Sequence, residues 1–380
     1  MTENNRSKTK AVMMSNLSCL RVLIAGGGTG GHLFPGLAVA RALLSRSSDI
    51  QVSFVGSLQG IEARTVPQEG FEIDFIRSSG LRGKSLFVQI RGLLRLLPSF
   101  WEAWQVVRRR QPNVVVGVGG YSSGPVVLAA VLQGSQTLIL EQNAIPGMTN
   151  RLLSRVVCAA AVNYKETCSY FGSKSFVSGN PVRQEFFSVR EDDKVHRRSI
   201  KRRNTSLLIF GGSQGAHVLN VAVKDALPEL KKLNLEITHQ TGEHDLSSVR
   251  DAYLKAGMRA RVEPFLPRMA DAMLAADLIV CRAGATTLAE LAAIGRAAVL
   301  VPLGISTDDH QRHNAEILER ASAAKILDER LLSGTSLVNV INELIKNPER
   351  LKQMGKTMSS FAVPNAAEII VDRIFALANE

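Results

Sequence analysis

Short apolar runs alternate with longer stretches of helical periodicity along most of the chain. The apolar runs fall at 21–25, 51–55, 114–118, 137–140 and 156–162 in the first half, and at 207–210, 236–240, 261–263, 278–280 and 298–301 in the second. Short runs of this kind between helical stretches are typical of parallel strands. The alternation predicts an α/β protein with two doubly wound sheets, whose ligands bind beyond the carboxyl ends of the strands.

The length of 380 residues is enough for two such domains. We expect a disordered extension over 1–18, an N-terminal domain over 19–180 and a C-terminal domain over 181–362, with a hinge at 179–183. An apolar helical pattern at the end of the chain predicts that 363–380 returns as a helix to the N-terminal domain.

Two glycine clusters each follow an apolar run and precede a helical stretch. They read Gly-Gly-Gly-Thr-Gly-Gly-His over 26–32 and Gly-Gly-Ser-Gln-Gly-Ala over 211–216. Glycine lets the backbone approach a phosphate closely, and the amides at the start of a helix favour an anion. A single cluster could equally be a tight turn, but two of them favour a nucleotide held by duplicated halves.

Two further glycine segments, 117–125 and 281–290, also follow apolar runs. In the second one, Thr286 and Thr287 would lie in the first helical turn, where hydroxyl and amide groups can hold a pyrophosphate. Glu290 would lie about one turn further on, where it could accept hydrogen bonds from two ribose hydroxyls. The alternative for Glu290 is a carboxylate that only favours the helix dipole.

The first glycine cluster matches the dinucleotide fingerprint, but the next strand ends in Phe-Val-Gly-Ser at 54–57 without an acidic residue for an adenosine ribose. A redox cofactor is therefore disfavoured. The four cysteines show no Cys-x-x-Cys spacing, so the sequence indicates neither a zinc site nor a disulfide framework. We expect no cofactor and a reducing, cytoplasmic compartment.

The net charge of +12 could suggest nucleic-acid binding, but the basic residues are not arranged for it. The segment 81–110 combines seven Arg and Lys residues with apolar side chains and with Trp101 and Trp104, the only tryptophans of the chain. This composition predicts a surface that docks on an anionic membrane without crossing it. The alternative is an ordinary amphipathic helix with a solvated basic face, and in either case Pro98 is expected to divide the segment into two helices.

Several of these segments occur together, in order, in one known family. The segments 26–35, 119–125, 141–143, 179–183, 211–216 and 281–290 together resemble the MurG family of glycosyltransferases. The resemblance implies the GT-B fold, with two Rossmann-like domains of doubly wound parallel sheet facing across a cleft. It also implies transfer of N-acetylglucosamine from UDP-N-acetylglucosamine to the undecaprenyl-linked acceptor lipid I, which gives lipid II for peptidoglycan, at the cytoplasmic face of the inner membrane.

The resemblance also assigns site residues. Glu290 would bind the ribose, the backbone of Leu266 would read the uracil, Arg183 would bind the donor, and Gln311 would hold sugar hydroxyls. The diphosphate and its neighbours would be contacted by Ser213, Ala285, Thr286, Thr287, Leu288 and Ala289. The N-terminal domain would close on the donor with Thr29, Gly30, Gly31 and Asn143.

For the chemistry, UDP can leave without a metal once helix N-termini and Arg183 meet its developing charge. The acceptor hydroxyl needs a base, and attack opposite UDP would invert the anomeric centre. His32 is the preferred base and Glu141 the second candidate, although His32 could instead cap its helix or bind phosphate. Two rival functions remain at this point, a UDP-N-acetylglucosamine epimerase of similar fold and a non-catalytic subunit that binds the sugar nucleotide.

Overall fold

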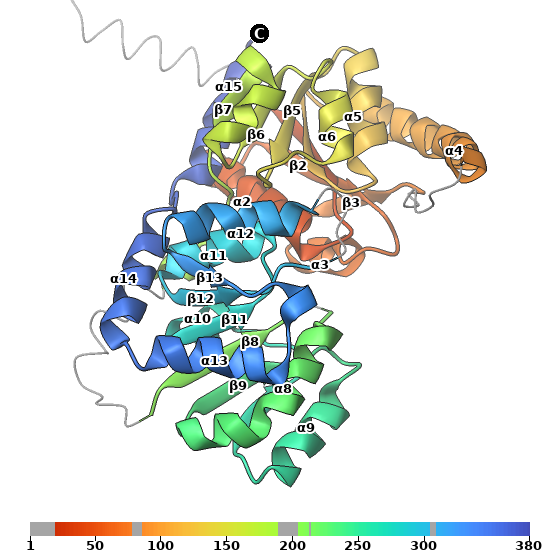
Figure 1. Cartoon of the computed structure of the whole chain (residues 1–380). Helices are drawn as coiled ribbons and strands as arrows, with labels where there is room; N and C mark the ends of the chain where they lie inside the picture. The colour runs from red at the N-terminus through yellow and green to blue at the C-terminus, as the bar shows by residue number, and fades with distance from the viewer. Residues whose placement is uncertain (1–19, 78–85, 189–203, 213, 305–308) are drawn as a thin grey trace, which may run out of the picture. The chain divides into compact units, whose positions relative to one another are not determined.

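The computed structural model describes residues 20–77, 86–188, 204–212, 214–304 and 309–380, with only the backbone for 86–96. The extension expected over 1–18 and the site candidate Ser213 therefore lie outside the described residues. The chain folds as two compact units, one made of Met1–Pro181 with Asn365–Glu380 and one made of Val182–Pro364. Figure 1 shows the course of the chain through each unit.

Unit 1 is built on a seven-stranded parallel sheet with the order β3-β2-β1-β4-β5-β6-β7. Its strands are β1 (Arg21–Gly26), β2 (Gln51–Gly56), β3 (Glu72–Phe75), β4 (Val114–Gly119), β5 (Gln136–Glu141), β6 (Ala159–Val162) and β7 (Ser175–Val177). Every residue of β4 is buried, as its apolar run predicts. The strand order reverses between β1 and β4, so the loops that follow these two strands meet at a topological switch point.

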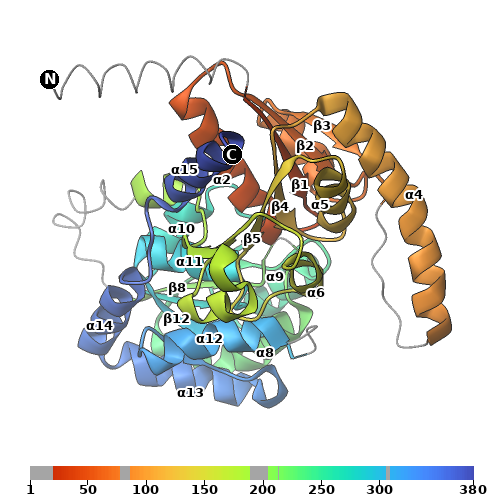
Figure 2. The same cartoon turned by 90° about the horizontal axis from the view of Figure 1, so that it is seen from above.

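Helices cover both faces of the unit 1 sheet. They are α2 (Gly30–Arg46), α3 (Glu62–Gln68), α4 (Leu86–Arg110), α5 (Ser123–Leu132), α6 (Met148–Leu153) and α15 (Ala366–Ala378), with short 3-10 turns at Lys165–Tyr170 and Gly172–Lys174. On one face α15 packs beside α2 (Figure 2), and Arg46 bonds Asp372 across this contact at 2.8 Å. On the other face α4 packs against α5, so the sheet is the middle of three layers.

The prediction that Pro98 divides the basic segment into two helices is wrong. α4 is continuous from Leu86 to Arg110 and contains Pro98. A proline inside a helix costs about 3 kcal/mol because one backbone hydrogen bond is lost and the ring clashes with the preceding turn. Burial of Ala103, Val106 and Val107 in the core offsets that cost by holding the last turns of the helix on the sheet.

Unit 2 has a six-stranded parallel sheet with the order β10-β9-β8-β11-β12-β13. The strands are β8 (Ser206–Phe210), β9 (Glu236–Gln240), β10 (Ala260–Glu263), β11 (Leu278–Cys281), β12 (Ala297–Leu300) and β13 (Ala324–Ile326). The order reverses between β8 and β11, which creates the same kind of switch point as in unit 1.

The helices of unit 2 also form two outer layers. They are α8 (His217–Leu230), α9 (Leu246–Lys255), α10 (Met269–Ala275), α11 (Ala285–Ile294), α12 (His310–Arg320), α13 (Gly334–Ile345) and α14 (Pro348–Ser359), with 3-10 turns at Lys231–Leu233 and Glu329–Leu331. Successive residues of β8 alternate between the two cores: Leu207 and Ile209 pack with α8, and Leu208 and Phe210 pack with α11.

Two further observations refine the sequence predictions. The strand expected over 156–162 begins only at Ala159, because the amides of Val156 and Val157 bond the carbonyl of Leu153 and close the turn after α6. Within the described part of the chain, no helix is both long enough and apolar enough to span a bilayer.

Candidate active site

The switch point of unit 2 is formed by the loops that follow β8 and β11. The first loop is the glycine cluster 211–216 and the second is Arg282-Ala283-Gly284. Gly215 has a positive φ of 75°, and a Cβ there would lie 2.0 Å from the carbonyl oxygen of Thr241. Only glycine fits this close approach, which fixes the β8 loop against the loop after β9.

Helix α11 starts directly at this switch point. Its N-cap is Gly284, which has no side chain to bond the first-turn amides. The helix therefore presents backbone N–H groups and a positive dipole end at the loop. Thr286 is buried and Thr287 half-buried in that first turn. The side chain of Leu288 belongs to the hydrophobic core, so only its backbone is available on this side, whereas Ala285 and Ala289 flank it with small side chains.

Glu290 and Arg183 form an ion pair in unit 2. An Nη atom of Arg183 lies 3.2 Å from the Glu290 carboxylate, and the other lies 3.1 Å from Glu185. The guanidinium also lies 4.9 Å from the ring centre of Phe186. Burial raises the pKa of Glu290 to about 7, although Arg183 opposes the shift. The carboxylate is thus poised between its two protonation states near neutral pH.

The remaining donor candidates of unit 2 lie in loops beyond the carboxyl ends of neighbouring strands. Leu266 is buried after β10. Gln311 is the second residue of α12, and its side-chain oxygen accepts from the amide of Leu303 at 3.1 Å. Because all strands of the sheet are parallel, both residues lie at the same end of the strands as Glu290, which Arg183 contacts.

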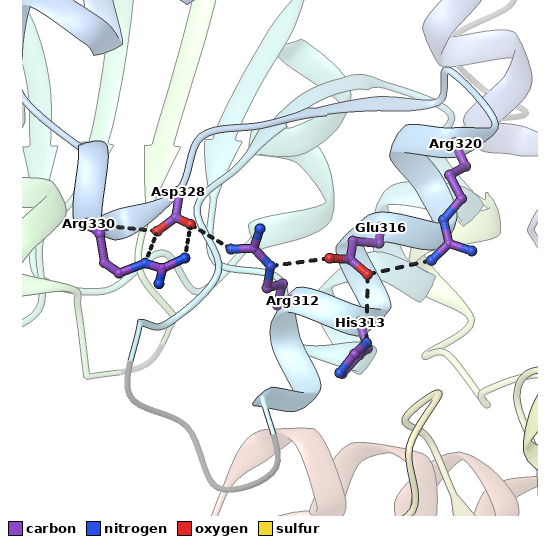
Figure 3. Close-up of polar contacts among 6 residues, drawn as sticks. All are labelled: Arg312, His313, Glu316, Arg320, Asp328 and Arg330. Carbon is purple, nitrogen blue, oxygen red and sulfur yellow. Dashed lines mark hydrogen bonds and ion pairs between the residues drawn. The ribbon is translucent and has the colours of Figure 1, made fainter.

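A chain of ion pairs holds α12 beside β13 (Figure 3). Arg312 bonds Asp328 at 2.5 Å and Glu316 at 3.2 Å, so it joins the helix to the segment after the strand. Arg330 completes the bonding of Asp328, and these arginine bonds hold the pKa of Asp328 well below its usual range. The other two members, His313 and Arg320, both contact Glu316. This network fixes the helix that carries Gln311.

In unit 1, the loops after β1 and β4 lie against each other. The amide of Gly27 bonds the carbonyl of Gly119 at 3.4 Å, and a Cβ on Gly120 would lie 2.5 Å from the carbonyl oxygen of Gly27. His32, the third residue of α2, is half-buried over this junction, since a Cβ on Gly119 would lie 2.6 Å from its ring. Its Nδ1 lies 3.3 Å from Oγ1 of Thr29, the N-cap of α2. Gly30 and Gly31 form the first turn between these two residues.

Glu141, the second base candidate, is engaged by the loop that follows β5. Its carboxylate accepts hydrogen bonds from the amides of Asn143 and Gly147, both at 3.0 Å, and from the side chains of Asn143 at 3.1 Å and Asn150 at 2.8 Å. Burial raises its pKa, and these bonds oppose the shift. The arrangement makes Glu141 the anchor that holds Asn143.

Sequence reasoning missed Glu62, which reaches the first glycine loop. Its carboxylate is buried and accepts from the amide of Gly28 at 2.7 Å and from the amide and hydroxyl of Ser57 at 2.9 and 3.0 Å. The signal in the sequence is the pair Gly56 and Gly60, which leaves room for an acid shortly after β2. Among the residues described, no cluster of three or more His, Cys, Asp or Glu side chains could hold a metal ion.

Two family models match the chain, one in each half. The glycosyltransferase family 28 N-terminal domain matches residues 22–162, and the glycosyltransferase family 28 C-terminal domain matches residues 206–370. The two matched segments contain the strands on both sides of each switch point.

Curated relatives and solved structures give the same result. The UDP-N-acetylglucosamine–N-acetylmuramyl-(pentapeptide) pyrophosphoryl-undecaprenol N-acetylglucosamine transferase of Syntrophus aciditrophicus is 44% identical over 366 residues, which cover 94% of this chain and 99% of the relative. The crystal structure of Acinetobacter baumannii MurG matches with a TM-score of 0.75 and 34% identity, over 93% of this chain and 99% of that one.

The UDP-GlcNAc 2-epimerase of Neisseria meningitidis, solved with UDP-GlcNAc, matches with a TM-score of 0.62 over 93% of this chain and 98% of that chain. At 15% identity this likeness shows a shared fold alone. The identity to the transferases is far higher and extends over nearly the whole chain. The chain therefore belongs to the MurG family of glycosyltransferases, within glycosyltransferase family 28.

Proposed function

We propose that this protein transfers N-acetylglucosamine from UDP-N-acetylglucosamine to an undecaprenyl-pyrophosphoryl-N-acetylmuramyl-pentapeptide acceptor, which converts lipid I to lipid II for peptidoglycan. The names of the curated relatives support this reaction. The observation that carries it in this chain is the ion pair of the half-buried Arg183 with the buried Glu290, beside the uncapped start of α11.

The donor would bind along α11 in unit 2. Its diphosphate would accept from the first-turn amides and from the hydroxyls of Thr286 and Thr287, where the helix dipole favours negative charge. The Glu290 carboxylate would accept from the two ribose hydroxyls, and Arg183 would favour its ionised form. The backbone of Leu266 would read the uracil, Gln311 would bind sugar hydroxyls, and Ser213 would contact the diphosphate.

His32 would act as the general base from unit 1. Its Nε2 can accept a proton only if Nδ1 carries the other one, and Oγ1 of Thr29 at 3.3 Å can accept that Nδ1–H. The acceptor hydroxyl would attack the anomeric carbon from the face opposite UDP, so the configuration inverts. Asn143, Gly30 and Gly31 are further candidates for substrate binding in unit 1, and the dipole of α11 and Arg183 would stabilise the departing UDP.

The polyprenyl acceptor requires contact with a bilayer, and unit 1 offers a surface for it. Exposed apolar side chains lie on three adjoining helices, α4, α5 and α6, and we call the following set the docking face: Leu97, Trp101, Leu132, Met148 and Leu152. Arg151 and Arg155 are exposed next to Leu152, where they can meet anionic headgroups. We expect the protein to act at the cytoplasmic face of the inner membrane through this face.

The docking face is narrower than the composition of 81–110 suggests. Trp104 is half-buried against Phe100, with ring centres 6.0 Å apart, and packs against the core. Arg109 and Arg110 bond Asp74 of β3, at 2.6 and 2.7 Å, so their charges are already neutralised. The basic residues at 82, 84, 91 and 95 lie outside the described side chains.

Two measurements test the proposal. Calorimetry with UDP-N-acetylglucosamine should give a heat of binding that is lost in Glu290→Ala, and a radiolabelled donor should label a short-chain lipid I analogue. Conversion of free donor to its C2 epimer without label transfer would identify an epimerase instead. Binding without either reaction would identify a non-catalytic subunit, and absence of binding would contradict all three functions.

A further inference from the structure

The Glu62 carboxylate lies inside a cage of glycine backbone. A Cβ added to Gly27 would lie 2.4 Å from its Cδ, one on Gly56 would lie 2.4 Å from its Cγ, and one on Gly60 would lie 2.0 Å from Oε2. These three glycines come from the β1 loop, from the end of β2 and from the turn before α3. The chain therefore keeps three positions free of side chains around a single buried carboxylate.

The caged carboxylate accepts hydrogen bonds from both loops that surround it. Oε2 accepts from the Gly28 amide at 2.7 Å, and Oε1 accepts from the Ser57 amide at 2.9 Å and its hydroxyl at 3.0 Å. A glycine loop before a helix commonly offers such an amide to a phosphate. Here the Glu62 carboxylate accepts the hydrogen bond from this amide, so it occupies the place that a bound anion has in such loops.

The bonded amide is one residue away from the turn that carries the proposed base. Gly28, with a positive φ of 83°, precedes Thr29, the N-cap of α2, whose hydroxyl contacts His32. The bond from its amide to Glu62 therefore holds a glycine whose backbone adopts a conformation that other residues rarely take. Loss of that bond frees a glycine that has access to many conformations, and the Thr29–His32 pair moves with it.

We propose that Glu62 is a positioning residue for the transfer reaction: it occupies the anion site of the first glycine loop and thereby fixes the Thr29–His32 turn. This inference rests on the proposed function, since it concerns the base of that reaction. Because Glu62 is buried and its oxygens already accept three hydrogen bonds, it acts through the loop and not on the substrate.

The test combines truncation with chemical rescue. Glu62→Ala leaves a site lined by the same donors, and sodium formate at about 0.1 M supplies a carboxylate small enough to enter it. We expect kcat of the variant to fall about 100-fold, because small displacements of a catalytic group have effects of this size. The KM for UDP-N-acetylglucosamine should stay within about threefold, and formate should restore kcat at least about tenfold, whereas sodium chloride of the same ionic strength should not.

Glu62→Gln and Asn113→Ala complete the experiment. In Glu62→Gln the side-chain NH2 group would face the amide and hydroxyl donors that now bond the carboxylate. The glutamine side chain would also fill the cage, so formate cannot rescue this variant. Asn113→Ala removes a side-chain bond to the amide of Arg21, 2.9 Å long, at the opposite end of β1, and should leave kcat unchanged. Wild-type kcat in Glu62→Ala, or a loss that formate does not reverse in the folded variant, would overturn the inference. Absence of transfer by the wild-type protein would instead contradict the proposed function.

Discussion

The guanidinium of Arg183 and the carboxylate of Glu290 lie 3.2 Å apart, although 107 residues separate them in the chain. Arg183 lies just after the chain enters unit 2, and Glu290 lies in the second turn of α11. Because the two groups are in contact, the protonation of the buried Glu290 depends on the charge of Arg183. This coupling has two measurable consequences.

The first consequence is a pH dependence of stability. The pKa of Glu290 is about 7 in the folded protein and near 4.5 when unfolded, so the folded state binds more protons between these values. The free energy of unfolding should therefore fall as pH rises from 4.5 to 7, by up to about 3 kcal/mol. Glu290→Gln should flatten this slope in urea titrations from about pH 5 to 8.

Glu343 provides the matched control for that titration. It pairs with Arg350 at 2.5 Å on the surface of unit 2, and this partner lowers its pKa. Its stabilising charge is lost only as pH falls below about 4.5, so Glu343→Gln should leave the slope between about pH 5 and 8 unchanged. A wild-type slope in Glu290→Gln would show that Glu290 titrates normally.

The second consequence concerns donor affinity. Arg183→Met and Glu290→Gln should each weaken binding of UDP-N-acetylglucosamine at least about tenfold, because each removes a charge-assisted contact to the nucleotide. The double variant should lose less than the product of the two effects, since the residues contact each other. Calorimetry on the four proteins at about pH 7.5 measures the coupling, and strictly additive losses would show that the pair does not act as a unit.

The longer strands were predictable because each carries buried apolar side chains. β1, β2, β4, β8 and β9 match the apolar runs to within a residue or two. β3, β7 and β13 were not predicted, because they are short and only partly buried. β3 carries Glu72 and Asp74, which bind arginines of α4, so its polar residues reflect tertiary contacts that a local pattern does not reveal.

The sequence indicated individual residues of the site but not the contacts between them. Motifs indicated Glu290, Thr286 and His32 individually, but the Arg183–Glu290 contact depends on how unit 2 folds. Glu62 was not predicted because it lies beyond the end of β2, where the dinucleotide fingerprint places its acid. The acid follows Gly60, and the turn directs it back to the β1 loop.

Removal of His32 should abolish base catalysis. His32→Ala should lower kcat about 10²- to 10⁴-fold, with little change in donor affinity, because the base acts on the acceptor hydroxyl. Thr29→Val should lower kcat by a smaller factor, because Nδ1 loses its hydrogen-bond acceptor, and Thr29→Ser, which keeps the hydroxyl, should restore most of it.

Steady-state transfer from about pH 5.5 to 9 provides the readout for His32. The acidic limb of the wild-type profile should disappear in His32→Ala and persist in His244→Ala, which removes an exposed histidine of unit 2. An acidic limb that survives in His32→Ala would assign the base to another residue.

The two tryptophans of α4 should respond differently to substitution. Trp101 is 61% exposed on the docking face, so Trp101→Ser should weaken binding to vesicles that contain anionic lipids about tenfold and leave the free energy of unfolding nearly unchanged. Trp104 packs on Phe100 and against the core, so Trp104→Ser should lower the free energy of unfolding by about 2–3 kcal/mol. Leu254→Ser, at a residue 76% exposed in unit 2, is the control for vesicle binding. Equal vesicle binding by Trp101→Ser and Leu254→Ser would place the membrane contact elsewhere, since the loss of an exposed aromatic ring should matter only where the ring enters the bilayer.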